Sequence, residues 1–325
     1  MRIGILTFRD EEIITPAEEL LLNAAKNRGH EIELIRSKDC QIALEDSRPQ
    51  LFFQHKLFPP FDVVITRLIG LRATDLDAIV VEQLQIDGIP VINEFNALIR
   101  ARNKIRTLQL LSKHGLPITK TVAIKQKSDI DFAIDYVKGP PAIIKTAFGS
   151  LGIGVCLVQS REELHALCDT MWALLPEDPT VSGTINRPAH EMILWQSAAS
   201  KMIMIQEYVK ESEGEDIRVF MVGGVVIATM KRKAKSGEFR SNFAQGGSVH
   251  PVIITPEEES LAIRAVDILG LDYAGVDILR SRRGPLLMEV NCNAGLEGIT
   301  RATGKDVAGS IIDFAVRKVH TSTSP

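Results

Sequence analysis

Two carboxylates and an amide fall on one predicted β-hairpin in the segment 274–291. A turn centred on Arg283 places Asp277 directly opposite Glu289, and Asn291, two residues further on, faces the same side of the sheet. Hard oxygen donors of this kind suit Mg²⁺ or Mn²⁺, with phosphate oxygens as the remaining ligands. We see no lysine on this face to neutralise both acids, so without metal at least one pKa is expected to rise. An exposed polar sheet face is the plainer alternative, but apolar residues flank both acids.

A second candidate site begins at Lys145, which ends an apolar strand just before the glycine-rich turn 149–154. Glycines let backbone N–H groups approach a phosphate, and the lysine adds a positive charge. The segment is not a Walker A motif, because no Gly-Lys-Ser/Thr follows. It is not a clean Rossmann fingerprint either, because a strand rather than a helix is expected next. A simple glycine-rich hairpin turn remains the alternative.

Several charged residues surround a predicted hairpin whose turn is the glycine pair 223–224. Its simplest register places Asp216 opposite Lys231 and Glu215 opposite Arg232. A structural ladder of ion pairs is therefore one interpretation of these charges.

Three further positions carry little information individually. Arg240 lies in the charged, glycine-rich loop 234–248, where a guanidinium suits capture of a phosphate or carboxylate. Taken alone, Lys104 is typical of a surface lysine, and Glu207 of an ordinary strand end.

Length and composition exclude several classes of protein. The 325 residues suggest roughly two domains, or one large one, and a net charge of −3 argues against polyanion binding by bulk charge. The four cysteines form no CxxC pair, and no apolar run reaches the ~18 residues of a membrane helix. The first apolar run is too short for a signal peptide, so a cytoplasmic protein is expected.

The elements that position these residues differ along the chain. Alternating strands and helices over residues 1–95 predict a small parallel-sheet α/β domain. One helix is expected from Phe95 to His114, and capping boxes open later helices at Ser160 and Thr255. The last third predicts α+β structure with antiparallel strands.

Taken in order, these motifs resemble the ATP-grasp superfamily. Within it the chain is similar to the RimK-like α-L-glutamate ligases, which add glutamate to a small-subunit ribosomal protein. The resemblance covers roughly residues 2 to 318 and is strongest in the segments QEYV, EGEDIRVFMVGG, GEFRSNFAQGG, AGVDILRSRRGPLLMEVN, GLEGI and TGKDVAG.

The resemblance implies three regions: a pre-ATP-grasp domain at 1–95, a small subdomain with a glycine-rich flap at 96–201, and a large subdomain with the metal site at 202–325. It also implies nucleotide-binding roles for Lys104, Lys145, Gly149, Gly152, Gly154, Glu207, Tyr208, Asp216, Arg240, Ser241 and Asn242. Asp277, Glu289 and Asn291 would bind the metals, expected to be two ions, while Arg218 and Arg240 are the candidate catalytic residues.

The activity implied is ADP-forming ligation of a carboxylate to an amine through an acyl phosphate. L-Glutamate would be joined to a protein C-terminus or peptide. Two alternatives stay open: a ligase for a small-molecule or cofactor acceptor, and a catalytically silent nucleotide-binding regulator. No membrane or direct nucleic-acid partner is expected, and homo-oligomerisation is left open.

The departures from the family pattern lie close to the cleft. The sequence has Asn291-Cys-Asn-Ala-Gly295 where Asn-x-Ser-Pro-Gly is favoured, and Ala-Arg-Asn-Lys104 where Ala-Arg-Asp-Lys is usual. The segment 168–201 is longer than in the type member. These changes leave the phosphate and metal groups intact and bear on the acceptor substrate.

Overall fold

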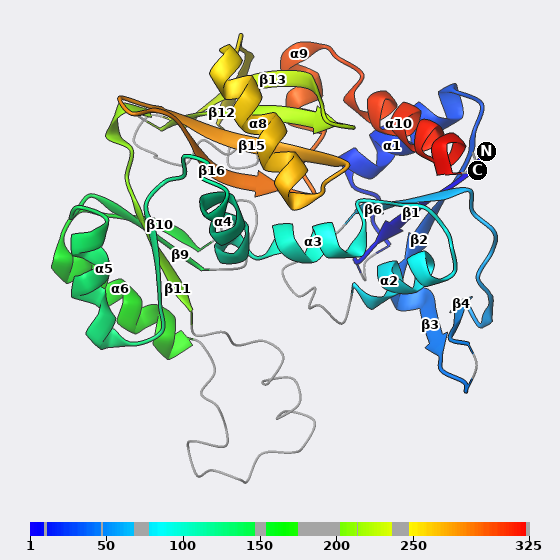
Figure 1. The fold of residues 1–325 in the computed structure, drawn as a ribbon, viewed down its shortest axis with the longest axis horizontal. Helices are drawn as coiled ribbons and strands as arrows, with labels where there is room; N and C mark the ends of the chain where they lie inside the picture. Colours follow the sequence, from blue (N-terminus) through cyan, green and yellow to red (C-terminus); the bar gives the residue numbers. More distant parts are fainter. Residues whose placement is uncertain are drawn as a thin grey trace. The chain divides into compact units, whose positions relative to one another are not determined.

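The computed structural model describes residues 1–9, 12–46, 48–67, 78–146, 154–174, 202–212, 214–235 and 247–322. The chain divides into two units (Figure 1). Unit 1 comprises residues 1–118 and 211–325, and unit 2 comprises residues 119–210.

Unit 1 opens with the predicted parallel sheet, here called the N-terminal sheet, with strand order β2-β1-β6-β7. Its elements are β1 (Arg2–Thr7), α1 (Pro16–Asn27), β2 (Glu31–Arg36), β6 (Val63–Arg67), α2 (Ile79–Ile86) and β7 (Val91–Ile92). Helix α1 begins at a capping box in which Thr15 and Glu18 satisfy each other's backbone N–H groups. The α/β character expected of this region is confirmed.

A small antiparallel sheet between β2 and β6 was not predicted. Its strands are β3 (Cys40–Ala43), β4 (Gln50–Phe53) and β5 (Lys56–Leu57). They are short and lack strict alternation, so the sequence pattern for them is weak.

The single helix expected from Phe95 to His114 is wrong. Two helices occupy this stretch, α3 (Phe95–Arg102) and α4 (Lys104–Lys113). Asn103 separates them with an extended backbone, and its side chain accepts hydrogen bonds from the backbone N–H groups of Ile105 and Arg106. This N-cap makes Lys104 the first residue of α4.

The rest of unit 1 is built on a second sheet, here called the large sheet, with strand order β14-β13-β12-β15-β16. Its strands are β12 (Glu215–Val222), β13 (Val225–Lys233), β14 (Ser248–Pro251), β15 (Tyr273–Ser281) and β16 (Gly284–Asn291). The helices are α8 (Pro256–Leu269), α9 (Glu297–Thr303) and α10 (Val307–Ser322). Helix α8 begins at the predicted Thr255 capping box and lies along one face of the sheet (Figure 1).

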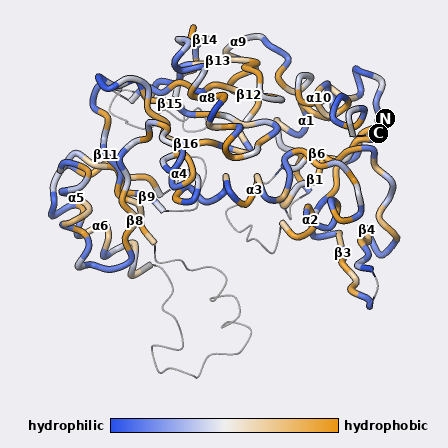
Figure 2. Tube along the Cα trace, viewed as in Figure 1, coloured by the Kyte–Doolittle hydropathy of each residue, from blue (hydrophilic) through white to orange (hydrophobic). Residues whose placement is uncertain are grey.

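The two faces of the large sheet are buried in different ways. One face, including Val219 and Val276, packs with Leu261 and Ala265 of α8 in a continuous apolar core. On the other face, Phe220 packs with residues of α9 and α10. Figure 2 shows hydrophobic colour concentrated along the strands of this sheet. The second face becomes ionic toward one end, where the candidate site lies.

Unit 2 is a four-stranded antiparallel sheet, here called the small-unit sheet, with two helices on one face. Its elements are β8 (Thr121–Ile124), α5 (Ile130–Tyr136), β9 (Ala142–Thr146), β10 (Val155–Val158), α6 (Arg161–Leu174) and β11 (Ile203–Glu207). Buried Ile144, Ile203 and Ile205 face α5 and α6, so the alternate strand positions occupy the opposite face. Among the described residues of both units, no helix is long and apolar enough to cross a lipid bilayer.

Candidate active site

Several of the charged residues that the sequence singled out lie at the polar end of the large sheet. Asp216, Arg218 and Phe220 alternate along β12 and so face the same side of the sheet. Across the ladder, Arg218 lies opposite Asp277 of β15, and Asp216 lies opposite Arg232 of β13. One sheet face therefore runs from an apolar to an ionic environment along its length.

The predicted opposition of Asp277 and Glu289 is confirmed, although the turn differs from the predicted one. The hairpin turn is the two residues Arg282 and Arg283, between paired Ser281 and Gly284. That turn alone would put Asp277 opposite residue 288. A bulge that leaves Met288 without a cross-strand partner shifts the register by one residue and restores the pairing with Glu289.

The expectation that these acids lack neutralising cations is wrong. Arg218 binds Asp277 in a two-pronged contact, Nε to Oδ1 at 2.8 Å and Nη2 to Oδ2 at 2.7 Å. Arg232 Nη2 lies 2.9 Å from the same Oδ2, and Asn291 Nδ2 donates to it at 3.1 Å. Burial alone would raise the pKa of Asp277, but Arg218 and Arg232 outweigh it, and the pKa is lowered.

Arg232 connects two aspartates in the interior of the sheet. Its Nε lies 2.6 Å from Asp216 Oδ1, and both side chains are almost fully buried. The predicted pairing of Asp216 with Lys231 and of Glu215 with Arg232 is wrong, because a bulge at Ile227 shifts the β12–β13 register by one residue. Glu215 instead lies opposite Lys233 and contacts it and Lys231 at 3.0 and 3.1 Å. The expected contact of Asp216 with a ribose stays a prediction.

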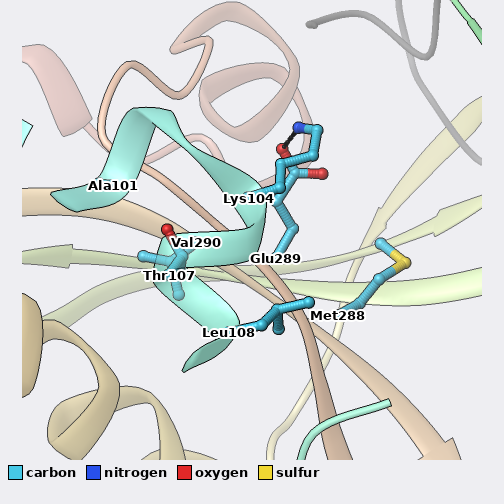
Figure 3. Close-up of a pocket in the computed structure, with 7 residues that line it drawn as sticks. All are labelled: Ala101, Lys104, Thr107, Leu108, Met288, Glu289 and Val290. Atoms are coloured by element: carbon cyan, nitrogen blue, oxygen red, sulfur yellow. Dashed lines mark hydrogen bonds and ion pairs between the residues drawn. The ribbon is translucent and has the colours of Figure 1, made fainter. Parts of the chain in front are cut away.

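Glu289 has a different environment at the edge strand β16. Its Oε1 lies 2.5 Å from Nζ of Lys104, the first residue of α4. The side chains are 23% and 13% exposed, so this pair is more accessible than the Asp277 cluster. In Figure 3 the two side chains point toward each other at the polar end of a small hollow, away from Leu108 and Met288.

The chemistry of this donor set fits a hard divalent cation. Asp277, Glu289 and Asn291 bring carboxylate and amide oxygens to one face of adjacent strands. Asp277 Oδ2 already accepts from three nitrogen donors, whereas Oδ1 accepts one from Arg218. Glu289 is therefore the more accessible of the two acids. The set contains two acids and an asparagine, so it is not a cluster of three acids. Within the described ranges, no group of three or more His, Cys, Asp or Glu side chains is placed to hold a metal ion.

Unit 2 contains the second predicted cation. Lys145 is buried near the end of β9, where Nζ donates to Gln206 Oε1 at 2.9 Å. Gln206 Nε2 in turn donates to Thr121 Oγ1 at 2.8 Å. This chain of polar contacts crosses β9, β11 and β8 on the sheet face opposite α5 and α6.

The neighbouring residues end the same sheet. Glu207 Oε1 accepts from the backbone N–H of Lys120 at 2.8 Å, which fixes the end of β11 beside the start of β8. Tyr208 follows and is half-buried. Gly154 has φ +73°, a left-handed conformation that suits glycine at this turn. Five predicted site residues lie outside the described residues: Gly149, Gly152, Arg240, Ser241 and Asn242.

Two buried polar residues of the N-terminal half were not singled out from the sequence. Asn93 uses its whole amide: Nδ2 donates to the carbonyls of Tyr273 and Cys292, and Oδ1 accepts from the N–H groups of Asp272 and Tyr273. Arg67 ends the buried strand β6 and donates to the carbonyl of Ala294. The signal for Arg67 was present, because a cation ending an apolar strand is also what marked Lys145.

The fold is that of the ATP-grasp ligases. The chain belongs to the RimK-like ATP-grasp family: residues 1–98 match the RimK PreATP-grasp domain, and residues 101–178 and 184–315 match the RimK-like ATP-grasp domain.

Among its relatives, a protein of Aliivibrio fischeri (strain MJ11) named "Probable alpha-L-glutamate ligase" is 39% identical over 321 residues, or 99% of this chain and 97% of the relative. A protein of Shewanella amazonensis named "Probable alpha-L-glutamate ligase 1" is 39% identical over 98% of this chain and 97% of its own length.

Solved structures share the fold at lower sequence identity. A RimK domain ATP-grasp protein from Sphaerobacter thermophilus has a TM-score of 0.67 at 21% identity, with 97% of this chain and 100% of that chain covered. The ATP-grasp ligase PsnB complexed with minimal precursor, Mg and ADP has a TM-score of 0.66 at 17% identity, with 98% of each chain covered. D-alanine–D-alanine ligase from Bacillus anthracis, complexed with ATP, has a TM-score of 0.64 at 17% identity and 99% and 98% coverage.

Proposed function

We propose that this protein uses ATP to join L-glutamate to the C-terminal carboxylate of a protein or peptide. The reaction would release ADP and phosphate and form an amide bond. The observation that carries the proposal is the grouping of Asp277, Glu289 and Asn291 on one face of the large sheet, with Arg218 and Lys104 in contact with the two acids. The names of the full-length relatives support glutamate as the amino acid.

Asp277, Glu289 and Asn291 would hold Mg²⁺ or Mn²⁺, with two ions expected. When bound, the metal would neutralise charge on the phosphate oxygens during phosphoryl transfer. Lys104 and Lys145 would contact those phosphates. Glu207 and Tyr208 would contact the adenine.

Two bond-forming steps follow from this chemistry. An oxygen of the acceptor carboxylate attacks the γ-phosphorus, the bond to the β-phosphate oxygen breaks, and an acyl phosphate and ADP result. The glutamate amine then attacks the acyl carbon, loses a proton and expels phosphate. Arg218 is positioned beside Asp277 and would stabilise negative charge on the acyl phosphate and on the tetrahedral oxyanion. No side-chain nucleophile is required.

The cysteine next to the proposed metal ligands is not suited to nucleophilic attack. Burial raises the pKa of Cys292 to about 11, so its thiol is protonated near neutral pH. Its side chain packs in the core of unit 1 instead.

The decisive experiment measures ADP release from Mg²⁺–ATP with a panel of amino acids, each with and without peptides that end in a free carboxylate. We expect release only when glutamate and a peptide are both present, with a mass gain of one glutamyl residue per addition. Release with a small acceptor in place of the peptide would favour a small-molecule ligase. Nucleotide binding with no release under any combination would favour a regulatory protein, and either result would overturn the proposal.

A further inference from the structure

One face of the N-terminal sheet changes from apolar to polar at the carboxyl ends of its strands. Ile5 of β1 and Ile65 of β6 are fully buried there. Two residues further along each strand, Thr7 lies opposite Arg67 on the same face, and each is only 2% exposed. The carboxyl ends of parallel strands are where open α/β sheets bind ligands.

Arg67 is a buried cation whose charge is not balanced within the described part of the chain. Its Nη1 donates to the Ala294 carbonyl at 3.2 Å, and its Nε has no hydrogen-bond partner. Among the described residues it forms no ion pair. The hydroxyl of the adjacent Thr7 also has no hydrogen-bond partner.

Arg232, the other arginine that is equally buried among the described residues of unit 1, shows what such a group normally needs. It contacts the carboxylates of both Asp216 and Asp277, at 2.6 and 2.9 Å. A charge taken out of water is costly unless an opposite charge and hydrogen bonds compensate it. Arg67 has the burial of Arg232 without its anions.

The Arg67 guanidinium also lies close to the proposed reaction centre. Ala294, which it contacts, packs on Gly275: a Cβ on Gly275 would be 2.7 Å from the Ala294 Cβ and 3.2 Å from Nε of Arg218. Ala294 therefore lies next to Arg67 and also next to Gly275, beside which the Arg218 side chain lies.

We propose that Arg67, assisted by the Thr7 hydroxyl, binds the side-chain carboxylate of the amino-acid substrate and so selects a dicarboxylic amino acid. This inference rests on the proposed ligase function. A guanidinium presents two parallel N–H donors that match the two oxygens of a carboxylate. A site that desolvates such a cation rejects an uncharged analogue, because the buried charge would then stay unpaired.

The first test compares steady-state kinetics of the wild-type protein and Arg67→Met with L-glutamate and L-glutamine as amino acids. We expect KM for glutamate to rise at least tenfold in the variant, KM for ATP to change less than twofold, and the preference for glutamate over glutamine to disappear. Arg28→Met is the matched control, because Arg28 pairs with Asp306 and Asp313 away from this site. It should leave all three measurements unchanged. A wild-type KM for glutamate in Arg67→Met would overturn the proposal.

The second test measures thermal unfolding, which does not depend on activity. Glutamate should raise the midpoint of the wild-type protein and not that of Arg67→Met. Without ligand, Arg67→Met should be at least as stable as wild type, because the substitution removes an uncompensated charge. Arg232→Met should be clearly less stable, because the buried carboxylates of Asp216 and Asp277 would lose the positive charge that they share. If Arg67→Met is destabilised as Arg232→Met is, Arg67 has a structural role and the proposal is wrong.

A third test repeats the unfolding measurement with inorganic phosphate, whose oxygens accept the same hydrogen bonds from a guanidinium as a carboxylate does. Protection by phosphate that depends on Arg67, with none by glutamate, would overturn the carboxylate assignment. Failure of the proposed function is a separate result: wild-type protein would then release no ADP with glutamate and peptide, while the glutamate-dependent unfolding shift would still report on Arg67.

Discussion

A carboxylate in the interior of the large sheet and a carboxylate at its edge have different surroundings. Asp277 on interior strand β15 and Glu289 on edge strand β16 are cross-strand partners on one face. The Asp277 side chain is 3% exposed and accepts hydrogen bonds from two arginines and an amide. Glu289 is 23% exposed and pairs with a lysine that reaches it from α4.

This difference indicates which acid serves the fold and which is available for a ligand. A carboxylate between two neighbouring strands loses its water, so the protein must supply its counter-charges. A carboxylate at the sheet edge keeps part of its solvent and can exchange a lysine for another cation at lower cost. Asp277 therefore has a structural share in the proposed site that Glu289 lacks.

The largest effect is expected for Asp277→Asn. Removing this carboxylate leaves Arg218 and Arg232 with an uncompensated charge, and breaking such a buried pair costs about 3–5 kcal/mol. Urea unfolding at neutral pH without metal measures the change, and ADP release should be lost as well. The repulsion between two unneutralised acids that the sequence suggests would instead leave stability unchanged or raised. A midpoint equal to that of wild type would show that the arginines rearrange at no cost and would remove the contrast with Glu289.

A smaller change in stability is expected for Glu289→Gln. Its pair with Lys104 is only partly buried, so the free energy of unfolding should fall by about 1 kcal/mol or less. Turnover should nevertheless be almost abolished, and Mg²⁺–ATP should no longer raise the unfolding midpoint as it does for wild type. Retention of that ligand-induced shift would separate Glu289 from metal binding. A loss of stability as large as that of Asp277→Asn would contradict the distinction between interior and edge.

These two predictions differ because of details that the sequence pattern did not contain. The placement of Asp277 opposite Glu289 was predictable, since period-two alternation and a short turn fix a hairpin's register to within one residue. The bulge at Met288 was not, because the same residues fit a regular ladder. In β12–β13 the equivalent bulge at Ile227 made the predicted pairs wrong by one position. Arg232 consequently binds the aspartates rather than Glu215.

Contacts between distant segments were the other part that sequence reasoning could not supply. The capping signals at Ser160 and Thr255 located the starts of α6 and α8 closely, because a cap is a local interaction. The break at Asn103 is local as well, but a cap within an otherwise continuous helical pattern competes with continuation of the helix. The pairing of Lys104 with Glu289 joins residues 185 positions apart, and no periodicity encodes it.

The smallest predicted quantity is the coupling between Lys104 and Glu289 themselves. It can be measured with a double-mutant cycle of wild type, Lys104→Met, Glu289→Gln and the double variant, from the free energy of unfolding of each. Because water still reaches both side chains, the coupling should be below about 1 kcal/mol. A weak coupling is what the proposed chemistry needs, since Lys104 must leave Glu289 to contact a phosphate while the carboxylate accepts a metal. A coupling of about 3 kcal/mol or more would mean that the edge pair stabilises the fold as strongly as a buried ion pair does, and Lys104 would then be a structural residue.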